Sequence, residues 1–274
     1  MKLIWCSDIH LNFLGRDDKE LFYQDLKDAD GDNILITGDI AESPNIAPIL
    51  AAMHDYTGKK IYFVAGNHDY YEGSIVKDRA RFKKFKFAHY LPKRSYVKLD
   101  KHTALVGQDG WGDCRNGDYE ESQKGLNKFT MADWLYIKEL NKAYLKYDAD
   151  VLKLALQKIA DKDAERMCRS VTRALMDKNI KRVIIASHVP PLEEACLHAG
   201  RKSSPYGLCF FSSKIFELVI IPIVEKHPEV DFLWLSGHTH SSVTVEKRPN
   251  LTVRVAKSEY YYPQIESIIE DDWH

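Results

Sequence analysis

Seven polar residues spread along the chain are of types that bind transition metals. They comprise two carboxylates, one amide and four imidazoles: Asp8, Asp39, Asn67, His10, His188, His238 and His240. Oxygen and nitrogen donors without a thiolate suit Mn, Fe, Zn, Co or Ni, and disfavour copper(I) or an iron–sulfur cluster. Seven donors are too many for one tetrahedral ion but suit two ions that share a carboxylate. We therefore expect two divalent transition-metal ions as cofactors.

Asp39 is the predicted bridge between the two ions. Its carboxylate has two oxygens, and the preceding Gly38 lets the backbone approach closely. Two divalent ions carry a charge of +4, which two carboxylates and a bridging hydroxide would reduce to about +1. The remaining positive charge would attract a phosphate.

Two of the donor pairs are two residues apart, Asp8 with His10 and His238 with His240. In an extended segment this spacing turns both side chains to the same side of the backbone. We therefore expect each pair to act from one extended loop.

The donors follow segments that have the composition of buried strands. In the N-terminal third the apolar runs alternate with amphipathic helices, and the strands are Lys2–Cys6, Ile34–Thr37 and Ile61–Ala65, with helices at Asp18–Ala29 and Ile46–Tyr56. This βαβαβ order predicts a parallel sheet covered by helices. Ligands of such sheets bind beyond the carboxyl ends of the strands, where the donors stand.

The rest of the chain contains further strands and one long helical stretch. Strands are expected at Tyr96–Leu99, Thr103–Val106, Val183–Ser187 and Phe232–Ser236, with a closing hairpin of Ser242–Glu246 and Leu251–Ala256. Ser74–Phe87 and Thr130–Asp177 have helical patterns, the second as an insertion over residues 118–180. The basic stretch from Arg79 to Lys86 places its phenylalanines as on the apolar face of a core helix.

Five sequence blocks occur in a fixed order. They are Asp8-x-His10, Gly38-Asp39, Gly66-Asn67-His68-Asp69, His188-x-Pro190-Pro191 and Gly237-His238-x-His240. This order resembles the calcineurin-like metallophosphoesterase superfamily, over residues 8–240. The resemblance implies an α/β chain of four layers, αββα, in which two face-to-face mixed β-sheets are flanked by helices. Residues 1–274 would form one such domain, with the helical insertion within it.

The resemblance also implies roles for individual residues. One ion would be bound by Asp8, His10 and His240, the other by Asn67, His188 and His238, with Asp39 bridging. A dimetal-bridging hydroxide would attack a phosphate ester. His68 would protonate or stabilise the leaving-group oxygen, with Asp69 orienting it. The implied activity is that of a metal-dependent phosphoesterase.

The blocks depart from some branches of the superfamily. Protein phosphatases have G-D-x-V-D-R-G, but here the block reads Gly38-Asp39-Ile40-Ala41-Glu42 and lacks the phosphate-gripping arginine. We therefore expect a small-molecule phosphomonoester or phosphodiester as substrate. The cyclic-nucleotide phosphodiesterase branch usually has Asp where Glu42 stands, and it stays open. Another arginine would then bind the substrate, and Arg115, with Asp113 and Asn116, lies in a glycine-rich loop where the superfamily places substrate contacts.

Composition narrows the class of protein further. The net charge of −1 argues against bulk nucleic-acid binding. Five cysteines form no CxxC pair and are odd in number, and no apolar run is long enough to cross a bilayer, so we expect a cytoplasmic protein without a membrane partner. The alternatives are a non-catalytic interaction scaffold, a nuclease or a nucleotide pyrophosphatase of the same fold. Such a scaffold typically lacks the catalytic histidine, and His68 is present.

Overall fold

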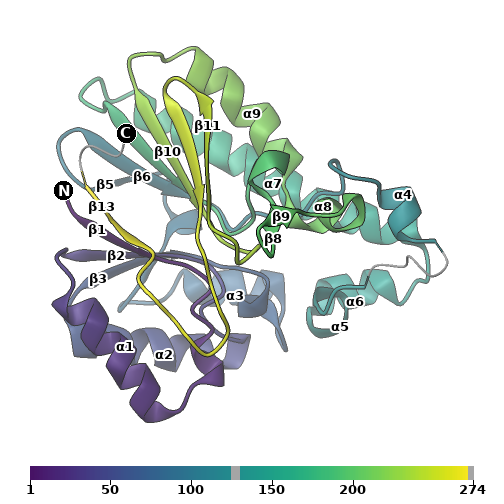
Figure 1. The fold of residues 1–274 in the computed structure, drawn as a ribbon, viewed down its shortest axis with the longest axis horizontal. Coiled ribbons are helices and arrows are strands. Elements are labelled where there is room, and N and C mark those ends of the chain that lie inside the picture. Colours follow the sequence, from purple (N-terminus) through teal and green to yellow (C-terminus); the bar gives the residue numbers. More distant parts are fainter. Residues whose placement is uncertain (125–129, 271–274) are drawn as a thin grey trace.

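Two β-sheets lie face to face in the computed structural model, which describes residues 1–124 and 130–270 (Figure 1). The five-stranded sheet has the order β13 (Ser267–Ile269), β1 (Leu3–Cys6), β2 (Asn33–Thr37), β3 (Lys60–Val64) and β4 (His89–Tyr90). β1 to β4 run parallel to their neighbours, and β13 runs antiparallel to β1. This sheet contains the predicted βαβαβ unit.

The second sheet is six-stranded and is built largely from the C-terminal half of the chain. Its order is β11 (Val243–Arg248), β12 (Leu251–Val255), β10 (Asp231–Ser236), β7 (Arg182–Ala186), β6 (Thr103–Gly107) and β5 (Val97–Lys98). The four inner strands are parallel, and the two edge strands β11 and β5 are antiparallel to their neighbours. The predicted closing hairpin is β11 and β12. A separate two-stranded ribbon joins β8 (Leu197–His198) to β9 (Arg201–Lys202).

Helices cover the outer face of each sheet. α1 (Arg16–Asp28), α2 (Ile46–Thr57) and α3 (Ile75–Phe82) lie on the first sheet, and α7 (Ala149–Leu175) and α9 (Lys214–Glu225) lie on the second. The predicted four-layer αββα architecture is therefore confirmed.

The strands are apolar on both faces because each sheet is covered on both sides. Along β1, Leu3 and Trp5 face the other sheet, whereas Ile4 and Cys6 face the helices. Leu233 and Leu235 of β10 reach the same core between the sheets. The short apolar runs of the sequence therefore encode a sheet buried on both faces.

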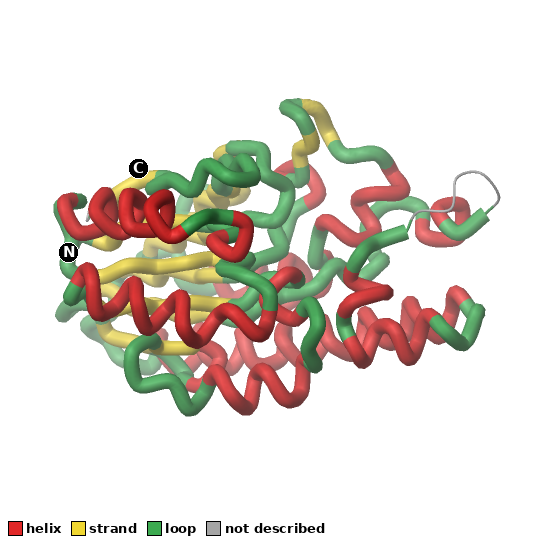
Figure 2. The backbone as a smooth tube through the Cα atoms, turned by 90° about the horizontal axis from the view of Figure 1, so that it is seen from below, coloured by secondary structure: helices red, strands yellow, loops and turns green. Residues whose placement is uncertain are grey.

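The described residues of the predicted insertion are mostly helical. The helices are α4 (Tyr119–Ser122), α5 (Asp133–Tyr136), α6 (Lys138–Tyr144) and α7. α4 to α6 extend beyond the ends of the sheets, whereas α7 runs back along the second sheet (Figures 1 and 2). Residues 125–129 of the insertion lie outside the described residues.

Several elements differ from the sequence-based expectations. α3 ends at Phe82, before the expected end at Phe87, and β5 pairs only at Val97–Lys98. α8 (Pro205–Phe211), α9 and β13 were not predicted. Within the described residues no single helix is long and apolar enough to cross a bilayer. The consecutive helices α8 and α9 together have that length and composition, but they meet at an angle of 65°.

A largely buried arginine joins three parts of the fold. The Arg79 guanidinium on α3 lies 2.6 Å from an Asp163 carboxylate oxygen on α7 and 2.9 Å from Asp109 Oδ2. Asp163 and Asp109 are almost fully buried, and Tyr70 and Tyr90 donate hydrogen bonds to Asp109 Oδ2. Arg79 therefore neutralises two carboxylates that have little access to water.

We expect Arg79→Met to lower the free energy of unfolding by about 3–5 kcal/mol, because it leaves buried carboxylates without a counter-charge. The matched control is Arg169→Met on α7, whose partner Glu165 is also exposed, and which should cost less than about 1 kcal/mol. Urea denaturation followed by tryptophan fluorescence measures both. Equal losses in the two variants would contradict a stabilising role for the buried cluster.

Candidate metal centre

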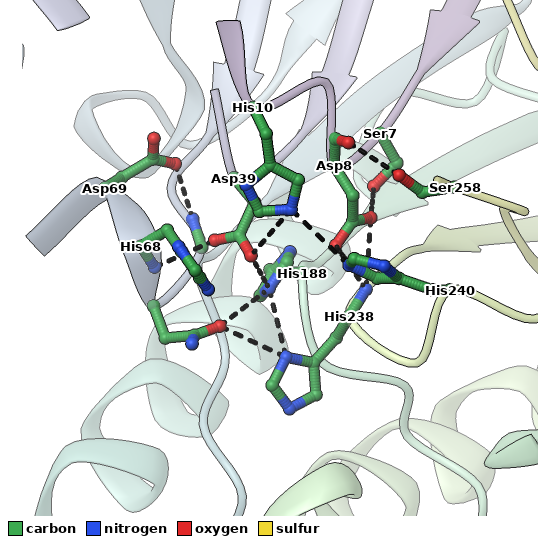
Figure 3. A network of polar contacts seen from close by, with 12 residues as sticks. Ser7, Asp8, His10, Asp39, His68, Asp69, His188, His238, His240 and Ser258 are labelled. Atoms are coloured by element: carbon green, nitrogen blue, oxygen red, sulfur yellow. Dashed lines mark hydrogen bonds and ion pairs between the residues drawn. The ribbon is translucent and has the colours of Figure 1, made fainter. Parts of the chain in front are cut away.

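The seven predicted donors all follow the carboxyl ends of parallel strands. Asp8, Asp39 and Asn67 come two or three residues after β1, β2 and β3, and His188 follows β7. His238 and His240 follow β10 in the same way. Because both sheets present these ends to one edge of the sandwich, the side chains point toward one another (Figure 3).

The first group of donors consists of Asp8, His10, Asp39 and His240. One ligand atom from each lies within 4.8 Å of the others. His240 Nε2 is 3.3 Å from Asp8 Oδ1 and 3.4 Å from His10 Nε2. Two ring nitrogens and two carboxylates that converge on one point form a site for a divalent cation.

The second group consists of Asn67, His188 and His238. Asn67 Oδ1 lies 3.0 Å from His188 Nε2 and 3.1 Å from His238 Nδ1. The other nitrogen of His188, Nδ1, is 2.9 Å from the backbone oxygen of Thr37. When Nδ1 donates to that carbonyl and Nε2 has lost its proton, Nε2 presents its lone pair to the centre, as metal-binding histidines require.

Asp39 belongs to both groups. Its Oδ2 atom is 3.8 Å from His10 Nε2 and 3.4 Å from His188 Nε2. Its other oxygen, Oδ1, accepts a hydrogen bond of 2.9 Å from the backbone N–H of His68. The residues present therefore fit two divalent cations with a shared carboxylate.

The backbone at the donors is strained. Five of them have φ in the left-handed region, at 49° for Asp8, 41° for His10, 52° for Asp39, 71° for His238 and 55° for His240. Residues with a side chain rarely adopt this conformation, and it is concentrated at functional sites. The prediction that each donor pair lies on an extended segment is therefore wrong. Sharp turns, not an extended chain, bring the paired side chains to the centre.

Two glycines allow the donor loops to touch. A Cβ at Gly38 would lie 2.5 Å from His188 Nδ1, and φ at this glycine is 96°. A Cβ at Gly66 would lie 2.1 Å from Asp39 Oδ1. No side chain fits at either position, so the close backbone approach predicted for Gly38 is present.

Hydrogen bonds between the loops fix the Asp8 carboxylate. Ser7 Oγ donates to Asp8 Oδ2 over 2.6 Å, and the backbone N–H of His238 donates to Asp8 Oδ1 over 3.0 Å. Ser258 Oγ donates to the backbone oxygen of Asp8 over 2.7 Å. Loops from both sheets and from the C-terminal segment therefore position this residue together.

The two carboxylates stay ionised although they are buried. Burial alone would raise the pKa of Asp8, but the His188 and His240 imidazoles bring it down to about 2. Burial also opposes ionisation of Asp39, yet His188 and His68 hold the pKa of this carboxyl well below its usual range. The centre therefore offers negative charge to cations at neutral pH.

The imidazoles divide into two kinds. Burial would lower the pKa of His188, but the Asp39 and Asp8 carboxylates raise it to about 10. Burial lowers the pKa of His10 to about 4 and the pKa of His238 to about 3. Without cations, the His188 ring is therefore doubly protonated and positively charged at neutral pH. The His10 and His238 rings are neutral, and each has a lone pair that can bind a metal.

His68 lies beside the centre but is in neither donor group. Its ring is 4.7 Å from the ring of His10 and stacks on Tyr71 at 4.3 Å, between ring centroids. The expected orientation by Asp69 is absent, because the Asp69 carboxylate accepts backbone N–H groups of Ile40, Ala41 and Gly66. Figure 3 shows this carboxylate apart from the His68 ring. Asp69 therefore ties the loops after β2 and β3 together, and Tyr71 packs on His68.

The sequence blocks did not reveal Asp133, a buried carboxylate on α5. Asp133 Oδ1 accepts hydrogen bonds from Asn67 Nδ2 over 2.9 Å and from the Tyr71 hydroxyl over 2.7 Å. Because the amide nitrogen of Asn67 is held by Asp133, the amide oxygen is left to face His188 and His238. α5 thus supplies a group that orients a donor. No spacing in the sequence connects Asp133 to the motifs.

The sequence blocks also did not reveal an aromatic side chain from the segment after β12. The ring of Tyr260 lies 4.5 Å from the ring of His10 and 5.1 Å from the ring of His240. Phe13, which follows the first motif, lies 5.6 Å from Tyr260. A run of three tyrosines in residues 260–262 was the available signal, but composition alone does not place it at the centre.

The structure does not bring the three predicted substrate-binding residues into contact with the donors. The Arg115 guanidinium pairs with Asp113 over 3.0 Å and with Asp161 of α7 over 2.7 Å. Asp113 also accepts the backbone N–H of Ile215, and Asn116 donates to Ser212 Oγ. Their described contacts join the glycine-rich loop to α7, to α9 and to the residue after α8. Because Arg115 already has two carboxylate partners, the structure favours a structural role for it.

Comparisons with known proteins agree with this geometry. The model for the calcineurin-like phosphoesterase family matches residues 1–242, and a search of curated proteins found no match. The chain is similar to a dimetal phosphatase from Danio rerio, with 12% identity, a TM-score of 0.57 and coverage of 94% of this chain and 87% of that chain. It is also similar to a phosphopantetheinyl hydrolase from Mycobacterium tuberculosis, with 14% identity, a TM-score of 0.58 and coverage of 94% and 89%. At these identities the likeness to solved structures shows a shared fold. Because the family model spans most of the sequence, the chain belongs to the calcineurin-like phosphoesterase family.

Proposed function

We propose that this chain is a hydrolase that cleaves a small-molecule phosphomonoester or phosphodiester with two divalent transition-metal ions. The observation that carries the proposal is the position of Asp39 Oδ2, which faces His10 at 3.8 Å and His188 at 3.4 Å. A carboxylate shared between two donor groups would hold two cations close together, as two-metal phosphoester hydrolysis requires. The metals are Mn, Fe, Zn, Co or Ni, which the nitrogen and oxygen donors suit.

The chemistry divides between the cations and the chain. When bound, two divalent cations would polarise the phosphoryl oxygens and lower the pKa of water at the centre. Asp39 lies between the two donor groups and would be shared by both cations. Asp133 keeps the amide oxygen of Asn67 turned toward the second group. His68, which is not a donor to either group, is free to protonate the leaving-group oxygen.

The main alternative is a non-catalytic scaffold on the same fold. A scaffold has no need of five strained donor residues or of an imidazole stacked beside them, so the complete site supports an enzyme. A cytoplasmic location is part of the proposal, and it is supported by the five cysteines, all of which are free.

The first test is the variant Asp39→Asn. Asparagine has the same size as aspartate, and its amide oxygen can take the place of Oδ1 as the acceptor of the His68 N–H. We expect lower occupancy by both ions and loss of turnover, because a neutral amide cannot bridge two cations. Elemental analysis after Mn²⁺ loading and rates on a panel of phosphate monoesters, diesters and cyclic nucleotides measure the effect. Two retained ions and a normal rate would contradict the two-metal proposal.

A second variant separates proton donation from metal binding. His68→Ala should leave the metal content unchanged and lower kcat by about 10²–10⁴-fold for alkyl phosphate esters. The loss should be smaller for 4-nitrophenyl esters, because the nitrophenolate anion leaves without a proton. Equal losses for both leaving groups would argue against His68 as the acid.

Metal uptake should be linked to pH through His188. Its pKa of about 10 means that it is protonated at neutral pH, and cations bind only the deprotonated ring. The apparent affinity for Mn²⁺ should therefore rise as the pH increases from neutral toward 10, with release of about one proton. Isothermal titration calorimetry in buffers of different ionisation enthalpy measures this release. Binding heats that do not depend on the buffer would show that no proton is displaced.

A further inference from the structure

We propose that the leaving group of the substrate carries a planar aromatic ring, which Tyr260 and Phe13 hold beside the centre. This inference rests on the proposed function and names the substrate class for the same site. It comes from an aromatic wall that the family motifs do not contain. Tyr260 lies beyond residue 242, the last residue matched by the family model.

The wall is in direct contact with the donor residues. The Tyr260 ring lies 4.5 Å from the ring of His10, 5.1 Å from that of His240 and 6.3 Å from that of His68. Phe13 lies 5.9 Å from His10 and meets Tyr260 at an interplanar angle of 76°. A substrate phosphate at the centre therefore has these two rings next to its substituent.

The aromatic rings are available to a ligand. Tyr260 is 40% exposed and Phe13 is 38% exposed, and the neighbouring Tyr261, 5.8 Å from Phe13, is 61% exposed. Single exposed apolar residues are common, but a group of them at the rim of a site marks a binding surface. Aromatic rings prefer to meet other rings in stacked or edge-to-face arrangements, and an aryl or heterocyclic group satisfies this preference.

The segment that carries Tyr260 is anchored at several points. We call residues 256–266 the strap, because they cross from the second sheet to the first. Ser258 Oγ donates to the backbone oxygen of Asp8 over 2.7 Å, and the N–H of Glu266 donates to the backbone oxygen of Trp5 over 2.9 Å. The Glu266 carboxylate in turn accepts the N–H of Lys257 over 3.1 Å. An anchored aromatic ring loses little freedom on binding, which favours recognition.

The position of the wall assigns it to the leaving group. His68, the proposed proton donor, must lie next to the leaving-group oxygen, and its ring is 4.7 Å from that of His10. Tyr260 packs over the same His10 ring and also approaches His68. The wall and the proton donor therefore lie on the same side of the centre, and the group that departs is the one in contact with the rings.

The test compares esters with and without a ring on four variants loaded with Mn²⁺. Tyr260→Leu and Phe13→Leu remove the ring but keep an apolar side chain, and Tyr260→Phe keeps the ring but removes the hydroxyl. Tyr262→Leu, in the same strap and 69% exposed, is the matched control. The substrates are 2-naphthyl phosphate, adenosine 5′-monophosphate and glycerol 3-phosphate, so that simple aryl groups and heterocyclic bases are tested separately.

We expect each leucine variant at the wall to lower kcat/KM for a ring-bearing ester, relative to glycerol 3-phosphate, by roughly three- to tenfold. The loss should appear mainly in KM, and Tyr260→Phe and Tyr262→Leu should keep the wild-type ratio. A selective loss for either ring-bearing ester supports the proposal, and the ester affected identifies the kind of ring.

Two results would overturn the aromatic subsite. An unchanged ratio in both wall variants would show that the rings do not contact the substrate, and equal losses on all esters with loss of Mn²⁺ would show that the strap only supports the donors. In both cases the wild-type protein still hydrolyses esters, and the proposed function stands. If the wild-type protein with two bound Mn²⁺ ions hydrolyses neither these three monoesters nor any monoester, diester or cyclic nucleotide of the wider panel, the proposed function itself fails, and the inference fails with it.

Discussion

The structure depends on keeping buried negative charge next to imidazoles within a few ångströms. Asp8 and Asp39 are 1% and 2% exposed, and a buried carboxylate without a partner is costly. Each carboxylate is compensated by the neighbouring histidines and by backbone N–H groups, from His238 to Asp8 and from His68 to Asp39. The histidines that offset the buried negative charge are also the residues that would bind the two cations. Folding and metal binding therefore both require these loops to hold the imidazoles beside the carboxylates.

This demand explains the way in which the two sheets are used. Strands buried on both faces form a rigid base, and their carboxyl ends hold loops whose backbone is strained at five donors. A strained backbone persists only when its surroundings hold it in place. Here Gly38 and Gly66 allow neighbouring loops to pack closely against the strained residues. The core between the sheets, with Leu3, Trp5, Leu233 and Leu235, supplies the necessary stability.

Segments outside the shared motifs complete the site. α5 contributes Asp133, which orients Asn67, and the strap contributes Tyr260, which packs on His10. Conversely, two residues that the motifs or loop composition suggested for direct roles hold loops and helices together. Asp69 accepts three backbone N–H groups, and Arg115 joins the glycine-rich loop to α7. A polar residue next to the donor motifs is therefore as well suited to holding the loops together as to acting at the centre.

The sequence by itself determined the fold and the donor types. Apolar runs followed by Asp, Asn or His encode strands that end at a ligand edge, and the order of the five blocks fixed the family resemblance. The tertiary structure alone decided which atoms meet. Three features could not be read from the sequence pattern. They are the left-handed turns at Asp8 and His10, the contact of Asp133 with Asn67, and the position of Tyr260 over His10. Local spacing reports the preferences of one segment, whereas these contacts arise from loops that approach one another only when both sheets have packed.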